Sequence, residues 1–213
     1  MIHGYQGYRL NFQLPDFNPQ PTLAGEHLLL RPLRVDDLEA LYQAASDPAT
    51  WAGHPIKERY KREVFEPYFR YLQDSGSALV VVDQKLDRII GCSRYYVAPD
   101  QITDISIGFT FIDRAYWGGA VNAELKRLML GHAFASFDFV WFHIDPTNIR
   151  SQKATAKLGA RHAYDATLNL SSKPAPWMCY RLDRTDWLKN QAWLSVQLSH
   201  PGRMNDDSQV SKT

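Results

Sequence analysis

The stretch "AYWGGAVNAELKRLMLGHAF", residues 115–134, carries the pattern that decides the fold. It follows a strand-like run, "ISIGFTFI" (105–112), and its two glycines precede apolar residues with helical spacing. Glycine removes side-chain bulk, so a ligand can approach the backbone closely. The start of a helix also presents unpaired amides and a partial positive charge. A strand, a glycine turn and a helix in this order therefore predict a binding site for an anion.

The residues from the glycines onward predict a helix over 118–137, because apolar side chains recur there every three or four positions. Beyond it, "FVWFHI" (139–144) predicts a short strand, and "NIRSQKATAKLGA" (148–160) predicts a helix that ends at Gly159. The segments 161–170 and 176–183 predict a terminal hairpin, and residues 185–198 predict a last helix.

Upstream of this region, "HLLLRPL" (27–33) predicts a strand and "RVDDLEALYQAASDP" (34–48) a helix. Asp36 as N-cap and Glu39 three residues later form a capping-box pattern, and Pro48 stops the helix. A second helical stretch, 61–76, contains Pro67, which is expected to bend or split it, and ends at Gly76.

Three strands are expected next, over 77–83, 88–97 and 102–112. The connections between them are short, which indicates an antiparallel meander. The whole order predicts an α/β (α+β) fold with a mixed, mostly antiparallel sheet flanked by helices. A strand–helix–strand crossover lies at its centre.

Length and charge narrow the class of protein. The chain has 213 residues, enough for one domain with a full core, and 24 basic against 23 acidic residues. A net charge of +1 argues against a protein that wraps nucleic acid or lies on a membrane surface. We expect a proline- and aromatic-rich N-terminal arm over 1–23, one domain over 24–199 and a disordered tail over 200–213.

Cysteine usage and the N-terminus indicate a compartment. Cys92 and Cys179 lie far apart and form no CxxC pair, so neither a disulfide scaffold nor a metal site is expected. The first residues, "MIHGYQGYRLNF", do not have the pattern of a signal peptide. No apolar run approaches the roughly 20 residues that span a bilayer. The sequence therefore predicts a cytoplasmic protein.

Three stretches carry a resemblance to a known family. They are "LLLRPLRVDDLEALYQAASDP", then "IGFTF" with "YWGGAVNAELKRLMLGHAF", and finally "NIRSQKATAKLGA". In this order and spacing the chain resembles the GNAT superfamily of acyl-CoA-dependent N-acetyltransferases from residue 24 to about residue 187. More narrowly, it resembles the branch related to ribosomal-protein N-terminal acetyltransferases. The resemblance implies that acetyl-CoA donates an acetyl group to a primary amine, a protein N-terminus or a small amine, which attacks directly in a ternary complex.

The glycine turn resembles the superfamily's pyrophosphate loop, Gln/Arg-x-x-Gly-x-Gly/Ala. Gly118 and Ala120 fill the two small positions, whereas Arg114 falls one residue too early for the basic position. Amides from 117 to 121 can still form an anion nest. Neither a GxGxxG fingerprint nor a P-loop is present, so the anion that the resemblance implies is the pyrophosphate of coenzyme A. A turn that merely caps a helix is the alternative.

The resemblance also implies which residues contact the cofactor. The pantetheine arm would lie along the strand before the loop, where Gly108 is the expected place for a bulge or close approach. The full cofactor-binding set is Gly108, Phe109, Thr110, Phe111, Trp117, Gly118, Gly119, Ala120, Val121, Asn122, Asn148 and Ser151.

Asn148, Ser151 and Thr155 share one face of the expected helix 148–160. The resemblance implies that Asn148 contacts the pantetheine and that Ser151 protonates the leaving thiolate. Many members carry a tyrosine where this chain has Thr155. Asn148 as an ordinary N-cap, and Ser151 as an ordinary helix-start residue, are the alternatives.

The general base is less well marked. His54 is the first candidate because an imidazole titrates near neutral pH, and water is the alternative. His132 and His143 are expected to be packing residues. The residues expected to bind the acceptor are Trp51, His54, Arg59, Arg94 and Tyr96.

Two other functions fit the sequence. One is a catalytically silent acyl-CoA-binding regulatory module, which the altered loop and the missing tyrosine favour. The other is an unrelated α/β protein. The sequence fixes neither the acceptor amine nor the oligomeric state.

Overall fold

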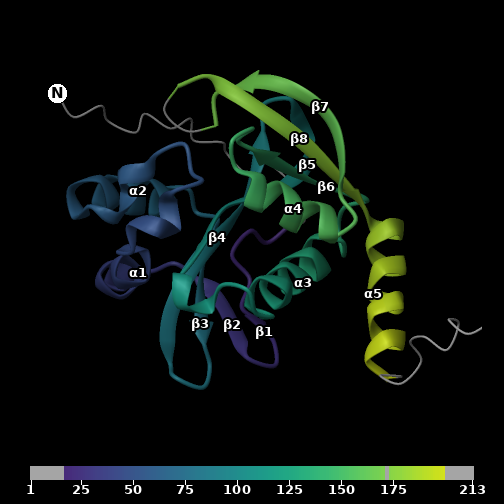
Figure 1. The fold of residues 1–213 in the computed structure, drawn as a ribbon, viewed down its shortest axis with the longest axis horizontal. Helices are drawn as coiled ribbons and strands as arrows, with labels where there is room; N and C mark the ends of the chain where they lie inside the picture. Colours follow the sequence, from purple (N-terminus) through teal and green to yellow (C-terminus); the bar gives the residue numbers. More distant parts are fainter. Residues whose placement is uncertain (1–16, 171–172, 200–213) are drawn as a thin grey trace, which may run out of the picture.

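The computed structural model describes residues 17–170 and 173–199, and its centre is an eight-stranded sheet (Figure 1). The strands lie in the order β1-β2-β3-β4-β5-β6-β8-β7. Their bounds are β1 Leu23–Ala24, β2 Leu28–Pro32, β3 Ala78–Asp83, β4 Arg88–Ala98, β5 Gln101–Ile112, β6 Phe139–Ile144, β7 Arg161–Leu168 and β8 Ala175–Asp183. The α-helices are α1 Leu38–Ala45, α2 Arg62–Asp74, α3 Val121–Ala133, α4 Ile149–Lys157 and α5 Arg184–Ser199.

The sheet topology confirms the expected mixed fold. All neighbouring strands pair antiparallel except β5 and β6, which are parallel and joined through α3. That parallel pairing involves only Ile105 with Val140 and Ser106 with Trp141. Beyond Ser106 the two strands are no longer paired, so the C-terminal part of β5 presents an edge toward β6.

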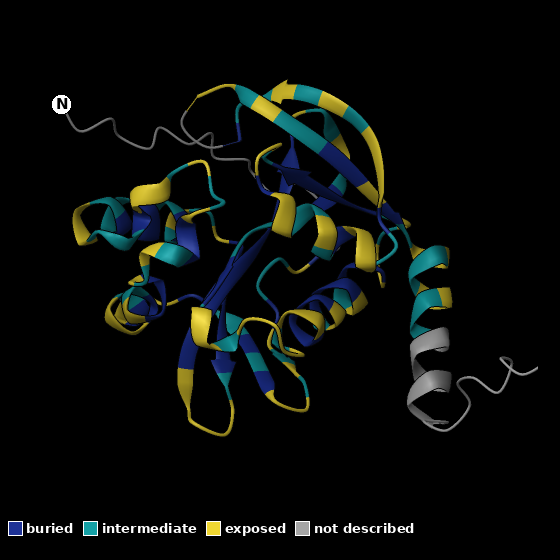
Figure 2. Cartoon of the chain, in the orientation of Figure 1, coloured by how far each residue is buried: buried dark blue, intermediate teal, exposed yellow. Residues whose placement is uncertain are grey.

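Side-chain alternation along the strands gives the sheet two apolar faces. In β3, Leu79 and Val81 join the cluster that contains Leu125 and Met129 of α3. Val80 and Val82 join the other cluster, whose members include Leu41 of α1 and Phe65 and Phe69 of α2. Figure 2 shows the buried central strands between these helices. The helices α3 and α4 lie on one side of the sheet, and α1 and α2 lie toward the other (Figure 1).

A bulge interrupts the pairing of β4 with β5 where β5 begins to separate from β6. Cys92 faces Phe111 and Arg94 faces Gly108, so β5 has one residue more than β4 in this interval. Phe109 takes up the extra length with a φ of 54°, which is rare for a residue other than glycine. Residues 108–110 are only partly buried, although the flanking parts of the strand are buried. The bulge thus leaves a short, accessible segment in the middle of the sheet.

Three local expectations need correction. α3 begins at Val121 rather than at Gly118, because Gly118 has a φ of 77°, which is incompatible with an α-helix. A 3₁₀ turn, η1 (Val35–Asp37), precedes α1, and the carboxylate of Asp37 accepts the Arg34 N–H at 2.8 Å; the expected caps Asp36 and Glu39 do not fulfil this role. α2 is continuous through Pro67, so the helix is not split there, and it ends at Asp74, before Gly76.

The described part of the expected N-terminal arm is attached to the sheet. The Phe17 ring lies 5.1 Å from the Tyr95 ring and 5.2 Å from the Phe137 ring, and Leu23 already belongs to β1. Residues 1–16 of the arm and the expected tail 200–213 lie outside the described residues. Within the described part of the chain, no helix is long and apolar enough to cross a membrane.

Candidate active site

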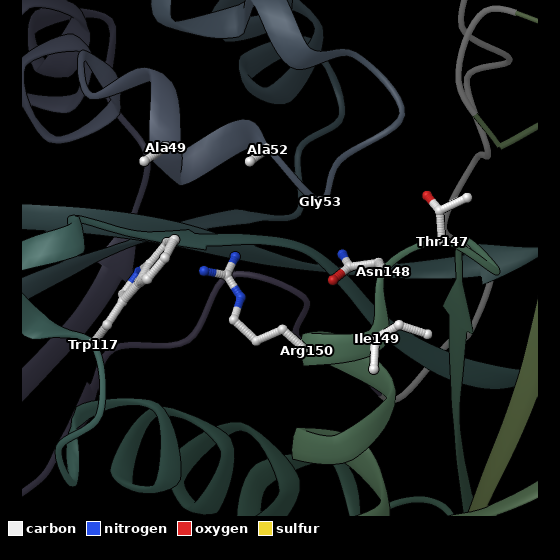
Figure 3. Close-up of a pocket in the computed structure, with 8 residues that line it drawn as sticks. All are labelled: Ala49, Ala52, Gly53, Trp117, Thr147, Asn148, Ile149 and Arg150. Atoms are coloured by element: carbon white, nitrogen blue, oxygen red, sulfur yellow. The ribbon is translucent and has the colours of Figure 1, made fainter.

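Three segments that are distant in sequence meet at a pocket of about 240 Å³ (Figure 3). The first is the connection that starts with η2 (Pro48–Trp51), the second is the glycine loop, and the third is the start of α4. The lining residues are Ala49, Ala52, Gly53, Trp117, Thr147, Asn148, Ile149 and Arg150. The expected acceptor segment and the expected cofactor loop therefore border one space.

Asn148 lies at the N-terminus of α4, where one of its side-chain polar atoms caps the helix and the other is unpaired among the described residues. Its Oδ1 accepts the Ser151 N–H at 3.1 Å, which makes it the N-cap of the helix. A Cβ on Gly53 would lie only 3.2 Å from this Oδ1, so the close contact between the two segments depends on a glycine. The Nδ2 of Asn148 makes no hydrogen bond within residues 17–170 and 173–199. This amide is free to donate to a ligand in the pocket.

The glycine loop presents backbone amides before α3. The Trp117 N–H already donates to the Arg114 carbonyl, so the expected anion nest over 117–121 loses one of its free amides. Within the described residues, the N–H groups from Gly118 to Val121 have no acceptor. A Cβ on Gly118 or Gly119 would meet no atom within 4 Å, so the space beside this loop is open.

Arg150 is a basic residue that the sequence did not single out. Its guanidinium lies 3.6 Å from the centroid of the Trp117 ring, at the start of the glycine loop (Figure 3). Burial lowers the pKa of Arg150, and no carboxylate lies within 4 Å of it among the described residues. It brings from α4 the positive charge that the loop itself lacks. The sequence did not indicate that Arg150 lies beside the glycine loop, because the two are far apart along the chain.

The expected acceptor residues after α1 belong to the segment that borders the pocket; Trp51 and Arg59 are buried there and His54 is partly buried. Trp51 is fully buried, and its indole N–H donates to the Ala45 carbonyl at 2.8 Å, so it supports the pocket wall from behind. Arg59 is 6% exposed, with its guanidinium 3.9 Å from the centroid of the Tyr68 ring. Burial, with the charges of Arg59 and Arg150, lowers the pKa of His54 to about 3. An imidazole with so low a pKa is a weak proton acceptor.

A chain of polar side chains, with one hydrogen bond and one charge contact, links β4, β6 and the turn between β4 and β5. The Tyr96 hydroxyl lies 2.9 Å from His143 Nδ1, and His143 Nε2 lies 3.4 Å from Asp100 Oδ1. Tyr96 crosses β5 at Gly108, where an added Cβ would lie 2.9 Å from the tyrosine ring. Gly108 thus makes room for a side chain of this protein, which the sequence did not indicate. His143, expected to be a packing residue, is fully buried but is part of this polar chain.

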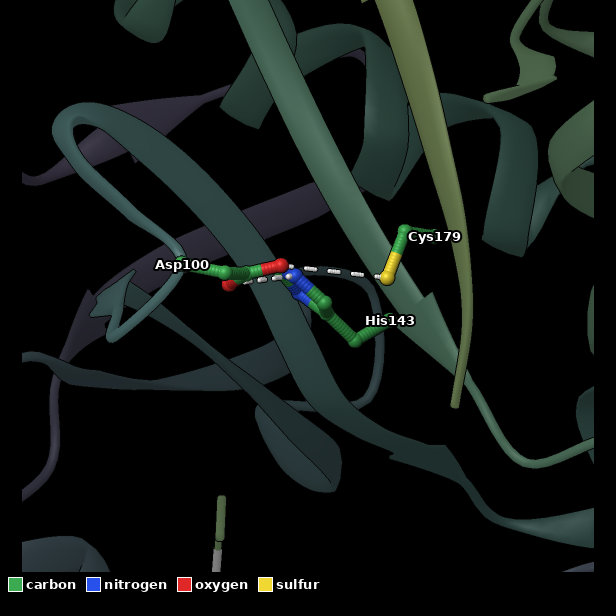
Figure 4. Close-up of side chains that lie close together, drawn as sticks. All are labelled: Asp100, His143 and Cys179. Carbon is green, nitrogen blue, oxygen red and sulfur yellow. Dashed lines mark hydrogen bonds and ion pairs between the residues drawn. The ribbon is translucent and has the colours of Figure 1, made fainter. Parts of the chain in front are cut away.

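Asp100, His143 and Cys179 form the one group of three metal-ligand side chains among the described residues (Figure 4). Burial raises the pKa of Asp100, but hydrogen bonds from His143 and from the Tyr164 hydroxyl outweigh it and hold that pKa below its usual value. Burial and the nearby Asp100 charge raise the pKa of Cys179 to about 12, so its thiol is protonated at neutral pH. Since thiolate is the form that binds metals, the absence of a metal site remains our prediction.

Arg94 and Tyr96 point to the same side of β4, as expected from their spacing. Arg94 is 4% exposed, and its guanidinium lies 4.7 Å from the Phe109 ring, 5.3 Å from the Tyr71 ring and 5.9 Å from the Tyr96 ring. The aromatic chamber of Tyr71, Tyr96 and Phe109 therefore surrounds a buried cation beside the bulge of β5.

On the other side of the bulge, Lys126 reaches from α3 to the sheet. Its Nζ donates to Thr110 Oγ1 at 2.9 Å, and that oxygen lies 2.7 Å from Ser93 Oγ. Burial lowers the pKa of Lys126 to about 7. The sequence pattern of α3 did not predict that Lys126 is buried, because a lysine in an apolar helix face usually extends its charged end into solvent.

The remaining expected residues lie around the same region. Ser151 is half-buried one turn into α4, Thr155 is 5% exposed, and Asn122 is exposed at the start of α3. Phe111 is buried in the sheet. The structure thus brings the expected cofactor residues to the edge of β5 and to the helix starts beside it. Arg94 and Tyr96 lie across the bulge from Lys126.

Comparisons with known proteins bear on the family and the fold. A profile of the GNAT acetyltransferase domain matches residues 27–161. A GCN5-related N-acetyltransferase from Brucella melitensis superposes with a TM-score of 0.69 at 16% identity, over 94% of this chain and 97% of that one. The sequence matches no curated protein at a significant level.

Two further solved structures are similar. RimJ of Mycobacterium smegmatis, in complex with CoA-disulfide, gives a TM-score of 0.60 at 14% identity, over 79% of this chain and 89% of RimJ. A candidate ribosomal-protein-serine acetyltransferase from Vibrio cholerae gives 0.63 at 14% identity, over 78% and 99%. At these identities the likeness shows the fold and leaves the acceptor open.

Proposed function

The chain belongs to the family of GNAT acetyltransferases, and from this premise we propose that it transfers the acetyl group of acetyl-CoA to a primary amine by direct attack. Acetyl-CoA-dependent acetyl transfer is the general reaction of the family. The acceptor would be a protein N-terminus or a small amine. Both cysteines are free and buried, which supports the expected cytoplasmic location.

One observation carries the proposal: the unused amides of the glycine loop follow Trp117 directly, and Trp117 lines one pocket together with Asn148, whose Nδ2 is free, and Arg150. The amides from Gly118 to Val121 suit a pyrophosphate, and Arg150 would add a positive charge to them. The unpaired edge of β5 from Ile107 to Phe111 suits an extended amide-containing arm that adds to the sheet like a strand. These groups fit coenzyme A in kind and in order along the chain.

When bound, acetyl-CoA supplies an acetyl thioester, which an amine can attack. We propose that Asn148 Nδ2 orients the acyl-carrying arm and that Ser151, one turn further along α4, gives a proton to the departing sulfur. Ser151 has this role only as the branch resemblance implies it. Its half-buried place beside Asn148 supports the assignment.

The attacking amine must lose a proton, and we propose that Tyr96, His143 and Asp100 remove it as a chain. Tyr96 would accept the amine proton while its own hydroxyl proton passes to His143 Nδ1, and Asp100 would stabilise the imidazolium that forms. Burial raises the pKa of Tyr96, which disfavours a free phenolate and favours a concerted transfer. We prefer this chain to His54, whose pKa of about 3 makes it a poor acceptor of an ammonium proton.

The test is a screen for acetyl transfer with the full chain, acetyl-CoA and a panel of amines. The panel contains peptides with free N-termini, polyamines, aminoglycosides and amino acids, and mass spectrometry detects each product. Titration calorimetry with CoA runs in parallel. Product formation supports the enzyme, CoA binding without any product supports a silent acyl-CoA-binding module, and absence of both overturns the proposal.

A further inference from the structure

Arg94 is a buried cation without an anionic partner in the part of the chain that the structure describes. It is 4% exposed, and its single hydrogen bond within the described residues runs from Nε to the Tyr95 carbonyl at 3.3 Å. Its Nη1 is buried and makes no hydrogen bond. No carboxylate of the described residues lies within 4 Å of the guanidinium. Burying an unpaired charge is costly, so a folded protein rarely retains one without a use for it.

Other arginines of the chain show the opposite pattern. Arg88, half-exposed, binds Asp113 at 2.6 Å, and Arg161, far more exposed, binds Asp186 at 2.7 Å. These exposed side chains need a partner least, because water solvates them well. Arg94 is buried and has no carboxylate partner among residues 17–170 and 173–199. Arg94 Nη1 is therefore a buried donor that a ligand anion could satisfy.

The aromatic chamber of Tyr71, Tyr96 and Phe109 prepares Arg94 for a planar anion. Its three rings surround the guanidinium at 4.7 to 5.9 Å, which favours the cation and limits its movement. The third ring belongs to Phe109, whose positive φ is an unfavourable backbone conformation for a residue other than glycine. The chamber therefore includes a strained residue. A fixed guanidinium fork matches a carboxylate, which it binds through two parallel hydrogen bonds.

The chamber lies where the acceptor amine would react. Phe109 belongs to the accessible bulge of β5, and Tyr96 is the first member of the proton chain proposed above. We propose that Arg94 binds a carboxylate of the acceptor, so that the enzyme acetylates amines that carry a carboxylate a few bonds from the amino group. This inference rests on the proposed function. An amino acid and a peptide with an N-terminal acidic residue both present such a group.

The experiment compares matched acceptors that differ only in the carboxylate. One arm sets β-alanine against propylamine, and the other sets a C-terminally amidated peptide that begins Asp-Ala against the same peptide that begins Asn-Ala. CoA release gives kcat/KM for each acceptor at saturating acetyl-CoA. We expect the carboxylate member of at least one pair to be favoured at least thirtyfold, and the arm that shows it separates a small amino acid from a peptide N-terminus.

The variant Arg94→Gln should abolish this preference, because loss of one member of a buried charge pair typically costs 30-fold or more. Arg161→Gln, a change at an exposed arginine far from the chamber, should leave it intact. Titration of the favoured acceptor in the presence of CoA gives a second readout without turnover, and only Arg94→Gln should lose binding. Arg94→Met should fold with unchanged or higher unfolding free energy, which excludes a merely structural role.

The outcomes separate this inference from the proposed function. If amines without a carboxylate are acetylated as fast as the matched amines with one, the proposed role of Arg94 is wrong and the proposed acetyltransferase function is retained. A carboxylate preference that survives in Arg94→Gln would lead to the same conclusion. Absence of transfer to every amine would instead reject the proposed function.

Discussion

The two polar ends of the Asn148 side chain allow its structural and ligand-binding roles to be separated. Oδ1 caps α4 through the Ser151 N–H, whereas Nδ2 is free toward the pocket. Asn148→Asp retains an acceptor for the cap and should keep the unfolding free energy within about 0.5 kcal/mol. It replaces the free donor with a charged oxygen, so we expect CoA affinity to fall at least tenfold by calorimetry. Asn148→Ala is the matched control, which should lose about 1 kcal/mol of stability as well. Equal CoA affinity in Asn148→Asp and the parent would show that Nδ2 does not contact the cofactor.

At His143 the prediction concerns rate. His143→Gln keeps a polar side chain at this buried position but cannot take up a proton, so kcat should fall by a factor of about 10² to 10⁴. CoA affinity should not change, because the His143 side chain is buried and its polar contacts are with Tyr96 and Asp100. Cys179→Ser changes the same cluster but keeps a donor for Asp100 Oδ2, which the Cys179 thiol contacts at 3.9 Å, and it should retain kcat. A His143→Gln enzyme with kcat within threefold of the parent would assign the proton to water.

Lys126 links pH to stability, because burial lowers its pKa from 10.5 to about 7. Between these values the unfolded chain binds a proton that the folded chain does not, so the unfolding free energy should rise with pH. For each pH unit between the folded-state and unfolded-state pKa values, the unfolding free energy changes by about 1.4 kcal/mol. Below pH 7 Lys126 is protonated in both states, so the unfolding free energy no longer falls on this account. Lys126→Met removes this dependence.

Denaturation of the parent and of Lys126→Met between pH 7 and pH 10 measures the effect as the difference between the two unfolding free energies. The unfolding free energy of the parent should increase relative to that of Lys126→Met as pH rises. Lys157→Met, at an exposed lysine of α4, is the control and should track the parent at every pH. A difference that stays flat would mean that Lys126 is hydrated in the folded protein.

At the scale of elements, substitution in the glycine loop before α3 tests the proposed anion site. Gly118 has a φ of 77°, so Gly118→Val forces a β-branched residue into a left-handed conformation at a cost of about 1–2 kcal/mol. The new side chain would also enter the open space beside the loop, where the pyrophosphate is proposed to lie, and CoA affinity should fall at least tenfold, about 1.4 kcal/mol. Gly131→Ala, inside α3, should stabilise the fold and leave CoA affinity unchanged, because its Cβ meets only Trp187 at 3.9 Å. CoA binding by a folded Gly118→Val protein at the parent's affinity would rule out the loop as the anion site.

The order of strands and helices could be predicted from the sequence, because it depends on local periodicity and on turn residues. The start of α3 could not, since a glycine before a helix can either begin it or, as Gly118 does, stop it from extending backward. Alternation placed Arg94 and Tyr96 on one side of β4. It could not show that Tyr96 crosses Gly108 to reach His143, because that contact depends on the neighbouring strands. The unpaired state of Arg94 and the burial of Lys126 likewise arise only from tertiary packing.

At the scale of the whole molecule, the sheet consists of two parts joined by a narrow seam. The strands β1 to β5 form one part and β6 to β8 the other, and only two residue pairs of β5 and β6 connect them. The glycine loop follows the first part and α4 follows β6 of the second. A ligand that lies along β5 and also contacts the loop and the start of α4 would link the two parts. Such a ligand should stabilise the molecule by mass action, by about 2.7 kcal/mol at a hundredfold excess over its Kd.

Hydrogen exchange tests whether CoA acts as this link. Amides between Ile107 and Phe111 on the open edge of β5, those from Gly118 to Val121, and the first turn of α4 should exchange more slowly with CoA bound, because each gains an acceptor or loses access to water. The paired strands β2 and β3, remote from the seam, provide the internal control, and their exchange should change only as far as global stability rises. Protection confined to the glycine loop would mean that CoA binds through its phosphates alone and leaves the seam open. Protection of β5 and α4 together would instead mean that binding joins the two parts of the sheet, and a single thermal transition should then shift upward as one unit.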